Sequence, residues 1–280
     1  MSEPMPHSGF HWITPDQFLK ETEKDLPRKI NIDFSDISYF VEVDLDYPSS
    51  LHDLHNDYPF YAESMMINYS LLSPEQRATS TAKKSIVNKL IPNLLDKRKY
   101  VMHYNNLKQA ADAGLILRKV HRVLKFNQSN WMANNIDLNT KRRAVAKTEF
   151  EKNFFKLMNN SVFSKTMENI HKRVNIEIVN NISRRNKLVN DDGFVSMKIL
   201  NENLVAMQRR KTNLKLNKPI YFGAAVLDIS KWLMYDFQYK FTKKQWPDSE
   251  LLYTDRDSLV YNIKCEDVYQ DIYENKNIFD

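Results

Sequence analysis

Tyr253-Thr254-Asp255-Arg256-Asp257-Ser258-Leu259-Val260-Tyr261 (YTDRDSLVY) is the most chemically specific stretch of the chain. Two aspartates flank one residue, and apolar strand-like sequence lies on both sides, so we predict a β-hairpin with the aspartates at its turn. A tight turn brings both carboxylates to one region, where they suit Mg²⁺. Two such ions about 3.5–4 Å apart stabilise the attacking and leaving oxygens of an in-line phosphoryl transfer. A solvated hairpin turn is the alternative, because Asp is a common turn residue.

A second pattern lies upstream, in a charged segment with helical spacing of its apolar residues, Leu138–Asn169. Lys152, Lys156 and Asn160 are spaced four apart and therefore share one helix face. Two cations and an amide on one stripe suit a triphosphate, and Phe163, one turn further on, suits a sugar or base. More positive charge lies nearby, at Arg142, Arg143, Lys147, Lys165, Lys172 and Arg173. A solvated charged helix face is the alternative.

Composition narrows the class of protein only moderately. The 280 residues, of which 42% are hydrophobic, are enough for one or two domains. A net charge of +6 fits a polyanionic partner, and it also fits an ordinary basic protein. Cys265 is the single cysteine, which excludes an internal disulfide and favours a reducing compartment. The sequence has no run of about 18 apolar residues and no signal-peptide core near its start. We therefore expect an intracellular protein, nuclear or cytoplasmic, that is not secreted and has no membrane partner.

The other elements predict a mixed α+β chain without regular alternation of strands and helices. We expect loop and short helix in the first thirty residues. Strands are predicted at Ser38–Asp46, Lys99–Tyr104, Arg118–Phe126, Val174–Val179, Val195–Leu200, Leu204–Leu216, Leu251–Thr254 and Ser258–Ile263. Further helices are predicted at Glu75–Leu90, Leu107–Ala113, Tyr221–Phe241 and Glu266–Asn275.

Together these patterns resemble family B DNA polymerases, in particular the protein-primed type of Polinton/Maverick transposons and related viruses. That family carries a helix motif, Lys-x-x-x-Asn-Ser-x-Tyr-Gly, followed later by a hairpin with Asp-Thr-Asp-Ser. The first motif is matched by Lys156, Asn160 and Ser161, and the second by Asp255, Asp257 and Ser258. The resemblance extends over nearly the whole chain, through Glu42–Pro59, His121–Trp131, Phe150–Asn169 and Asn217–Phe237.

The resemblance implies a polymerase palm, an antiparallel sheet backed by helices, with inserted helical fingers. Residues 1–137 would hold palm strands and an insertion, and residues 138–173 the helical fingers. Residues 174–216 would form a small β insertion that helps to encircle DNA, and residues 217–280 the palm helix and catalytic hairpin. It also implies that the exonuclease region, the first palm carboxylate motif and the thumb are missing from these 280 residues.

The resemblance also implies template-directed nucleotidyl transfer with Mg²⁺, acting on a DNA primer–template and dNTPs, with a terminal protein primer as a further partner. Asp255 and Asp257 would be the catalytic metal ligands, with Asp257 the direct one. The dNTP would be bound by Lys152, Lys156, Asn160, Ser161 and Phe163, the last in place of the usual tyrosine. DNA would be bound by Arg142, Arg143, Lys165, Arg209, Arg210 and Lys211.

Some positions depart from the family pattern. Arg256 replaces the small threonine between the aspartates, and its guanidinium could pair with both carboxylates. Ser164 replaces a glycine. Glu42 and Asp44 precede a Tyr-Pro pair as the first carboxylate motif does, but we assign them to a neighbouring palm strand. We therefore expect no activity from the isolated chain, and the alternative function is a degenerate, non-catalytic DNA- and dNTP-binding remnant of a mobile element.

Overall fold

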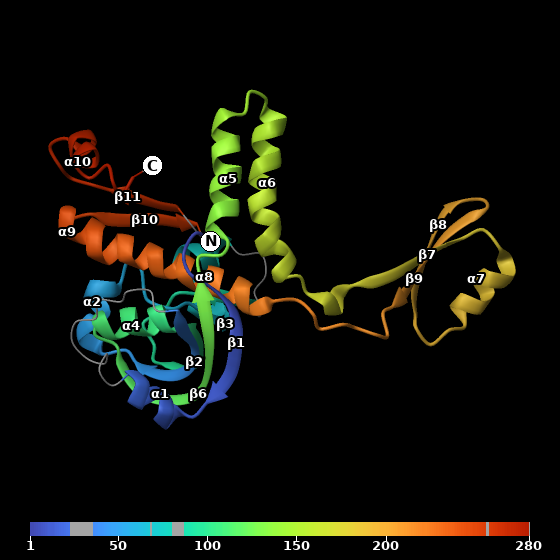
Figure 1. Ribbon diagram of the computed structural model, residues 1–280, viewed down its shortest axis with the longest axis horizontal. Helices are drawn as coiled ribbons and strands as arrows, with labels where there is room; N and C mark the ends of the chain where they lie inside the picture. The colour runs from blue at the N-terminus through green and yellow to red at the C-terminus, as the bar shows by residue number, and fades with distance from the viewer. Residues whose placement is uncertain (23–35, 68, 80–86, 256–257, 280) are drawn as a thin grey trace. The chain divides into compact units, whose positions relative to one another are not determined.

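The computed structural model describes residues 1–22, 36–67, 69–79, 87–255 and 258–279 (Figure 1). The chain divides into two compact units, one formed by Met1–Asn134 with Ala225–Asp280, the other by Asn135–Ala224. The paired strands are antiparallel, so the predicted α+β class is confirmed. None of the described helices has the length and apolar character needed to cross a membrane.

The first unit is built on a four-stranded sheet in the order β1-β6-β2-β5, with β3-β4 and β10-β11 as separate two-stranded sheets. Its strands are β1 (Met5–Ile13), β2 (Ile37–Asp46), β3 (Glu63–Ile67), β4 (Val87–Ile91), β5 (Lys97–His103), β6 (Ile116–Ser129), β10 (Glu250–Asp255) and β11 (Ser258–Asn262). Its helices are α1 (Pro15–Thr22), α2 (His52–His55), α3 (Pro74–Thr79), α4 (Tyr104–Asp112), most of α8 (Ile220–Asp236), α9 (Lys243–Gln245) and α10 (Val268–Glu274). Short 3₁₀ turns are η1 (Ser49–Leu51) and η2 (Tyr69–Leu71), and η4 (Phe237–Thr242) continues α8 as a π-helix.

The strand β2 lies between β6 and β5 and carries the core of this sheet (Figure 1). Val41, Val43 and Leu45 are almost fully buried. The intervening carboxylates belong to the opposite face, as strand alternation requires. This strand was predicted from the same alternation, and the structure confirms it.

The second unit contains a helical hairpin and a three-stranded sheet. Most of α5 (Ala133–Val145) and all of α6 (Glu149–Thr166) form the hairpin (Figure 1). The sheet has the order β7-β9-β8, with β7 (Val174–Val179), β8 (Phe194–Asn201) and β9 (Leu204–Arg210). The 3₁₀ turn η3 (Ile170–Lys172) precedes it, and α7 (Ile182–Val189) packs on one face through Leu188, which is buried with Val179 and Met207.

Several predicted elements were wrong or incomplete. The start of the chain was expected to be loop and helix, but β1 pairs with β6 across two irregularities. Gly9 lies at one of them with a φ of +69°, where a Cβ would stand 2.6 Å from Asn127 Nδ2. Pro and Gly are uncommon within strands, which is why this edge strand was not predicted from the sequence.

The predicted helix Glu75–Leu90 is also wrong beyond its first turns. Its start forms α3, whereas residues 87–91 form β4, which pairs with β3. Residues 80–86 lie outside the described part of the chain. β9 ends at Arg210 rather than Leu216, because its partner β7 begins at Val174, opposite Arg210. The helix α7 was not predicted.

Tyr61 joins three parts of the first unit. Its backbone N–H donates to Tyr235 Oη at 2.9 Å, and its hydroxyl donates to the Asn106 carbonyl at 2.5 Å. Tyr235 Oη donates in turn to the carbonyl of Pro59 at 3.1 Å. The φ of Tyr61 is +59°, in the left-handed region that bulky residues rarely adopt. These bonds fix α4, α8 and the segment before β3 to one another.

Two buried histidines predict how the stability of the first unit depends on pH. Burial lowers the pKa of both His55 and His103 from 6.5 to about 4. Between about pH 6.5 and 4 the unfolded chain therefore binds protons that the folded chain does not. Stability is full above pH 6.5 and falls by about 1.4 kcal/mol per pH unit for each histidine as the pH drops towards 4.

Urea unfolding at pH 7 and pH 5, followed by tryptophan fluorescence, measures this loss. All four tryptophans belong to the first unit, so the signal reports on that unit. His55→Phe retains an aromatic ring against Phe60 and Tyr239, at 5.0 Å from each in the native cluster, and should halve the pH dependence. A free energy of unfolding that is the same at both pH values contradicts the prediction.

Candidate nucleotidyl-transfer site

The predicted carboxylate pair lies at the β10–β11 hairpin. Asp255 is the last residue of β10, and it pairs in register with Ser258, the first residue of β11. Its side chain is exposed. Asp257 and Arg256 lie outside the described residues, so the structure places only one of the two predicted metal ligands.

The described residues fit Mg²⁺ only in part. The Asp255 carboxylate has hard oxygens of the kind that Mg²⁺ binds, and it has no ion pair or hydrogen bond with the described residues. Within the described ranges, no three His, Cys, Asp or Glu side chains come together as a metal site. A magnesium ion also takes ligands from water and substrate phosphates. One protein carboxylate is therefore only part of a complete set of ligands.

The helix α6 carries the predicted nucleotide-binding residues. Its start is fixed by a capping box, in which Glu151 N–H donates to Thr148 Oγ1 at 3.2 Å and Thr148 N–H donates to Glu151 Oε2 at 3.3 Å. Lys152, Lys156 and Asn160 are all exposed on the face predicted from their spacing. Neither lysine has an ion pair within the described part of the chain.

Ser161 and Phe163, the other two predicted nucleotide-binding residues, are less available to bind a nucleotide. Ser161 Oγ donates to the carbonyl of Met158 at 3.1 Å, so its hydroxyl is engaged with the helix backbone. Phe163 is half-buried. Sequence reasoning missed the amide pair that fixes this helix against its neighbour: Asn139, which is buried, donates through Nδ2 to Asn159 Oδ1 at 2.9 Å.

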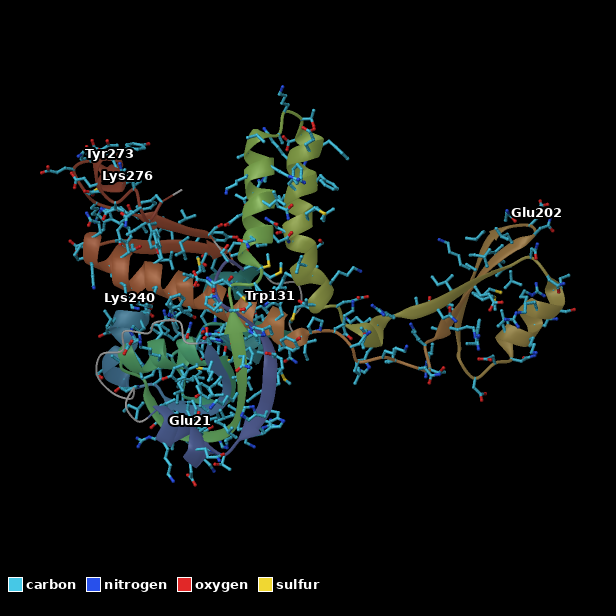
Figure 2. All side chains as sticks on the ribbon, viewed as in Figure 1. Glu21, Trp131, Glu202, Lys240, Tyr273 and Lys276 are labelled. Carbon is cyan, nitrogen blue, oxygen red and sulfur yellow. The ribbon has the colours of Figure 1, made fainter. Side chains whose placement is uncertain are left out.

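Charge is distributed very unevenly between the two units. Residues 135–224 hold 18 of the 41 lysines and arginines but only eight of the 35 carboxylates, a formal charge of +10. The remainder of the chain is therefore at −4, which together give the +6 of the whole. Glu202, at the β8–β9 turn, is one of those few carboxylates (Figure 2). Positive charge of the chain is thus concentrated in the second unit.

The predicted DNA-binding residues are not equivalent. Arg209 Nη2 lies 2.7 Å from Asp191 Oδ2, and this guanidinium lowers the pKa of Asp191. Arg210 and Lys211 are exposed, with no ion pair among the described residues. The remaining three, Arg142, Arg143 and Lys165, are exposed in the last turns of α5 and α6. A cation there also stabilises the helix end, which is the structural alternative.

Glu42 and Asp44 are held in ion pairs on β2. Arg122 Nε donates to Glu42 Oε2 at 2.7 Å and lowers the pKa of that carboxyl. Asp44 Oδ1 accepts from Lys99 N–H at 2.7 Å and lies 2.9 Å from His121 Nε2. The backbone bond from Lys99 is the main cause of the lowered pKa of Asp44. Both carboxylates thus belong to the charged face of the sheet.

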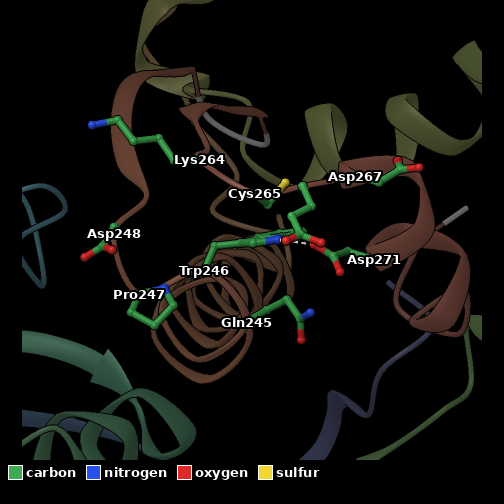
Figure 3. A pocket seen from close by; sticks show the side chains of 9 residues that line it. Gln245, Trp246, Pro247, Asp248, Lys264, Cys265, Asp267 and Asp271 are labelled. Carbon is green, nitrogen blue, oxygen red and sulfur yellow. Dashed lines mark hydrogen bonds between the residues drawn. The ribbon is translucent and has the colours of Figure 1, made fainter.

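A cavity of about 300 Å³ lies beyond the hairpin, where β11 leads into α10 (Figure 3). Trp246 lines it and donates through Nε1 to Asp271 Oδ2 at 2.7 Å. This bond ties α10 to the end of α9. The lining also includes Asp248, Asp267 and the exposed Cys265, but these side chains do not form a metal-binding group.

No protein-family model matches the chain, and no curated protein matches it. Among solved structures, phi29 DNA polymerase complexed with primer–template DNA, a post-translocation binary complex, aligns with 97% of the chain at 12% identity and a TM-score of 0.48. An orthorhombic crystal form of phi29 DNA polymerase aligns with 87% of the chain at 14% identity and a TM-score of 0.44. The chain covers 37% and 34% of those two chains, about a third of their length.

Proposed function

We propose that residues 1–280 are part of a family B DNA polymerase, with the palm, fingers and insertion boundaries given by the sequence. The observation that carries this proposal is the presence of both polymerase motifs on suitable elements of one chain. Asp255 ends a hairpin strand, and Lys152, Lys156 and Asn160 share an exposed face of a long capped helix. The substrates are a DNA primer–template and dNTPs, and a terminal protein primer belongs to the same proposal.

Each predicted residue has a defined task in this mechanism. Lys152 and Lys156 neutralise the triphosphate of the incoming nucleotide, and Asn160 orients it through its amide. Asp257 and Asp255 would hold Mg²⁺. The ion would supply charge stabilisation for the attacking 3′ oxygen and the leaving pyrophosphate oxygen. The cations of the basic unit bind the DNA backbone without reading its sequence.

The second candidate is a non-catalytic DNA- and dNTP-binding remnant. It is favoured by one observation, the arginine at position 256 between the two aspartates. A guanidinium can bridge neighbouring carboxylates and so compete with a metal ion. If this function holds, nucleotide and DNA bind but no primer is extended, and Arg256→Thr raises metal-dependent activity.

Asp257→Asn should abolish primer extension by a protein that contains residues 1–280 in their natural context. The loss should be roughly 100-fold or more, the scale for removing a group that stabilises transition-state charge. Binding of primer–template should be unchanged, since that surface lies on other residues. Asp248→Asn, which removes an exposed carboxylate from the segment that leads into β10, is the matched control. Equal activity of the two variants rejects the polymerase proposal.

DNA binding should depend on salt through the basic unit. Arg210→Ala with Lys211→Ala should flatten the log–log salt slope of DNA binding by about 0.7–0.9 for each phosphate that is no longer neutralised. Lys152→Ala with Lys156→Ala should instead weaken dNTP binding more than DNA binding. Fluorescence anisotropy of a labelled primer–template across a salt series measures the slope.

The matched control is Lys20→Ala with Lys89→Ala, which removes two exposed lysines from the first unit. This variant should bind DNA with the wild-type slope. If the salt slopes of the three double variants are indistinguishable, binding follows net charge alone. The assignment of a DNA surface to Arg210 and Lys211 would then be wrong.

A further inference from the structure

Hydrogen bonds tie the β10–β11 hairpin to the rest of the first unit. A two-stranded hairpin is marginally stable by itself. Two of its apolar residues remain largely uncovered, since Leu252 is 64% exposed and Tyr253 is 60% exposed. The position of the two strands therefore depends on the side chains that tie them to the rest of the unit.

The link from β11 is made by Tyr261. Its hydroxyl donates to Gln238 Oε1 at 2.5 Å. Gln238 is fully buried and lies in the π-helix η4. The widened helix thus presents a buried amide oxygen to the hairpin. Single π-turns of this kind occur frequently at functional sites.

A second link holds the entry to the hairpin. Lys243 Nζ donates to the carbonyl of Ser249, directly before β10, at 2.6 Å, and to Asp57 Oδ2 at 3.2 Å. Gln238 and Lys243 belong to consecutive helical turns, η4 and α9, so one helical stretch supplies both attachments.

Gln238 is a buried side chain whose amide is only partly hydrogen bonded. Its Nε2 is buried and has no hydrogen-bond partner among the described residues. Leaving a buried donor unsatisfied is costly, and an apolar side chain of similar size would fill the space without that cost. What an apolar side chain cannot do is accept the bond from Tyr261.

We propose that Gln238 is a positioning residue, which acts through Tyr261 to fix the β10–β11 hairpin, whose first strand ends at Asp255. This inference rests on the proposed polymerase function, since Asp255 is taken as part of the metal-binding site. Misplacing reacting groups slightly, through residues that never touch substrate, costs roughly 100-fold in rate.

Gln238→Met and Tyr261→Phe test the β11 anchor, with Tyr100→Phe as the control. Tyr100 is also a partly buried tyrosine whose hydroxyl donates to a backbone carbonyl, that of Ala62 at 3.0 Å, but it has no link to the hairpin. The first two variants should speed amide hydrogen exchange in β10 and β11 by about tenfold, the effect of removing one hydrogen bond, and leave β2 and β6 unchanged.

In primer extension by a protein that contains residues 1–280 in their natural context, the same two variants should lower kcat by roughly 10- to 100-fold with little change in KM for dNTP. Gln238→Met should leave the urea midpoint unchanged or raise it, because an unsatisfied amide is removed. A purely structural role would instead lower the midpoint and leave kcat intact.

The outcomes separate this inference from the function on which it rests. Equal exchange in Tyr261→Phe and Tyr100→Phe overturns the anchoring, whatever the activity. Faster exchange with an unchanged kcat, in an enzyme that Asp257→Asn inactivates, overturns the positioning role. Full activity of Asp257→Asn rejects the proposed function alone, because the exchange comparison still decides whether the hairpin is anchored.

Discussion

The hydrogen-bonded contact between Tyr61 and Tyr235 is the constraint on which the first unit depends. Tyr61 sits in a left-handed backbone conformation that costs of order 1–3 kcal/mol for such a residue, and it persists because its surroundings determine it fully. Its N–H and hydroxyl both have partners, and its ring lies 5.6–5.7 Å from those of Tyr235 and Tyr100. Since η4 continues from α8, the helix that holds the hairpin through Gln238 is fixed at this contact.

The two units differ in how completely their charged side chains are paired. On the sheet of the first unit, carboxylates and cations cancel locally: Asp46 pairs with both Arg98 and Arg118, much as Glu42 pairs with Arg122. In the second unit, Glu168 accepts from Arg173 and Lys218, and these two partners lower its pKa to about 2. Few carboxylates remain for the other cations there. The imbalance therefore stays on the surface, where an anionic partner gains most from it.

The alternation and spacing of apolar residues were enough to predict those elements whose boundaries depend on their own residues. Val174–Val179 was predicted residue for residue, and β2 to within one residue, because each alternates and is paired along its whole length. The sequence did not reveal β1, whose Gly9 matters only through its close approach to Asn127, or the end of β9, which is set by where β7 begins. For the site, spacing predicted the exposed face of α6. It could not reveal the Asn139–Asn159 pair, because residues 20 apart meet only once the hairpin has formed.

Lys97 and Gln238, two buried polar side chains of the first unit, differ in how completely their hydrogen-bonding groups are satisfied. Lys97 is fully buried, but its ammonium donates to Glu63 Oε2, to Asn93 Oδ1 and to the Asn93 carbonyl, so its three donors are satisfied and it serves the fold. Gln238 is equally buried, yet its amide is only half used, and the half in use is the bond to Tyr261. An interior selected for stability alone would replace such a glutamine with an apolar residue. Its presence under the hairpin is explained if the location of β11, rather than the stability of the unit, is what that bond maintains.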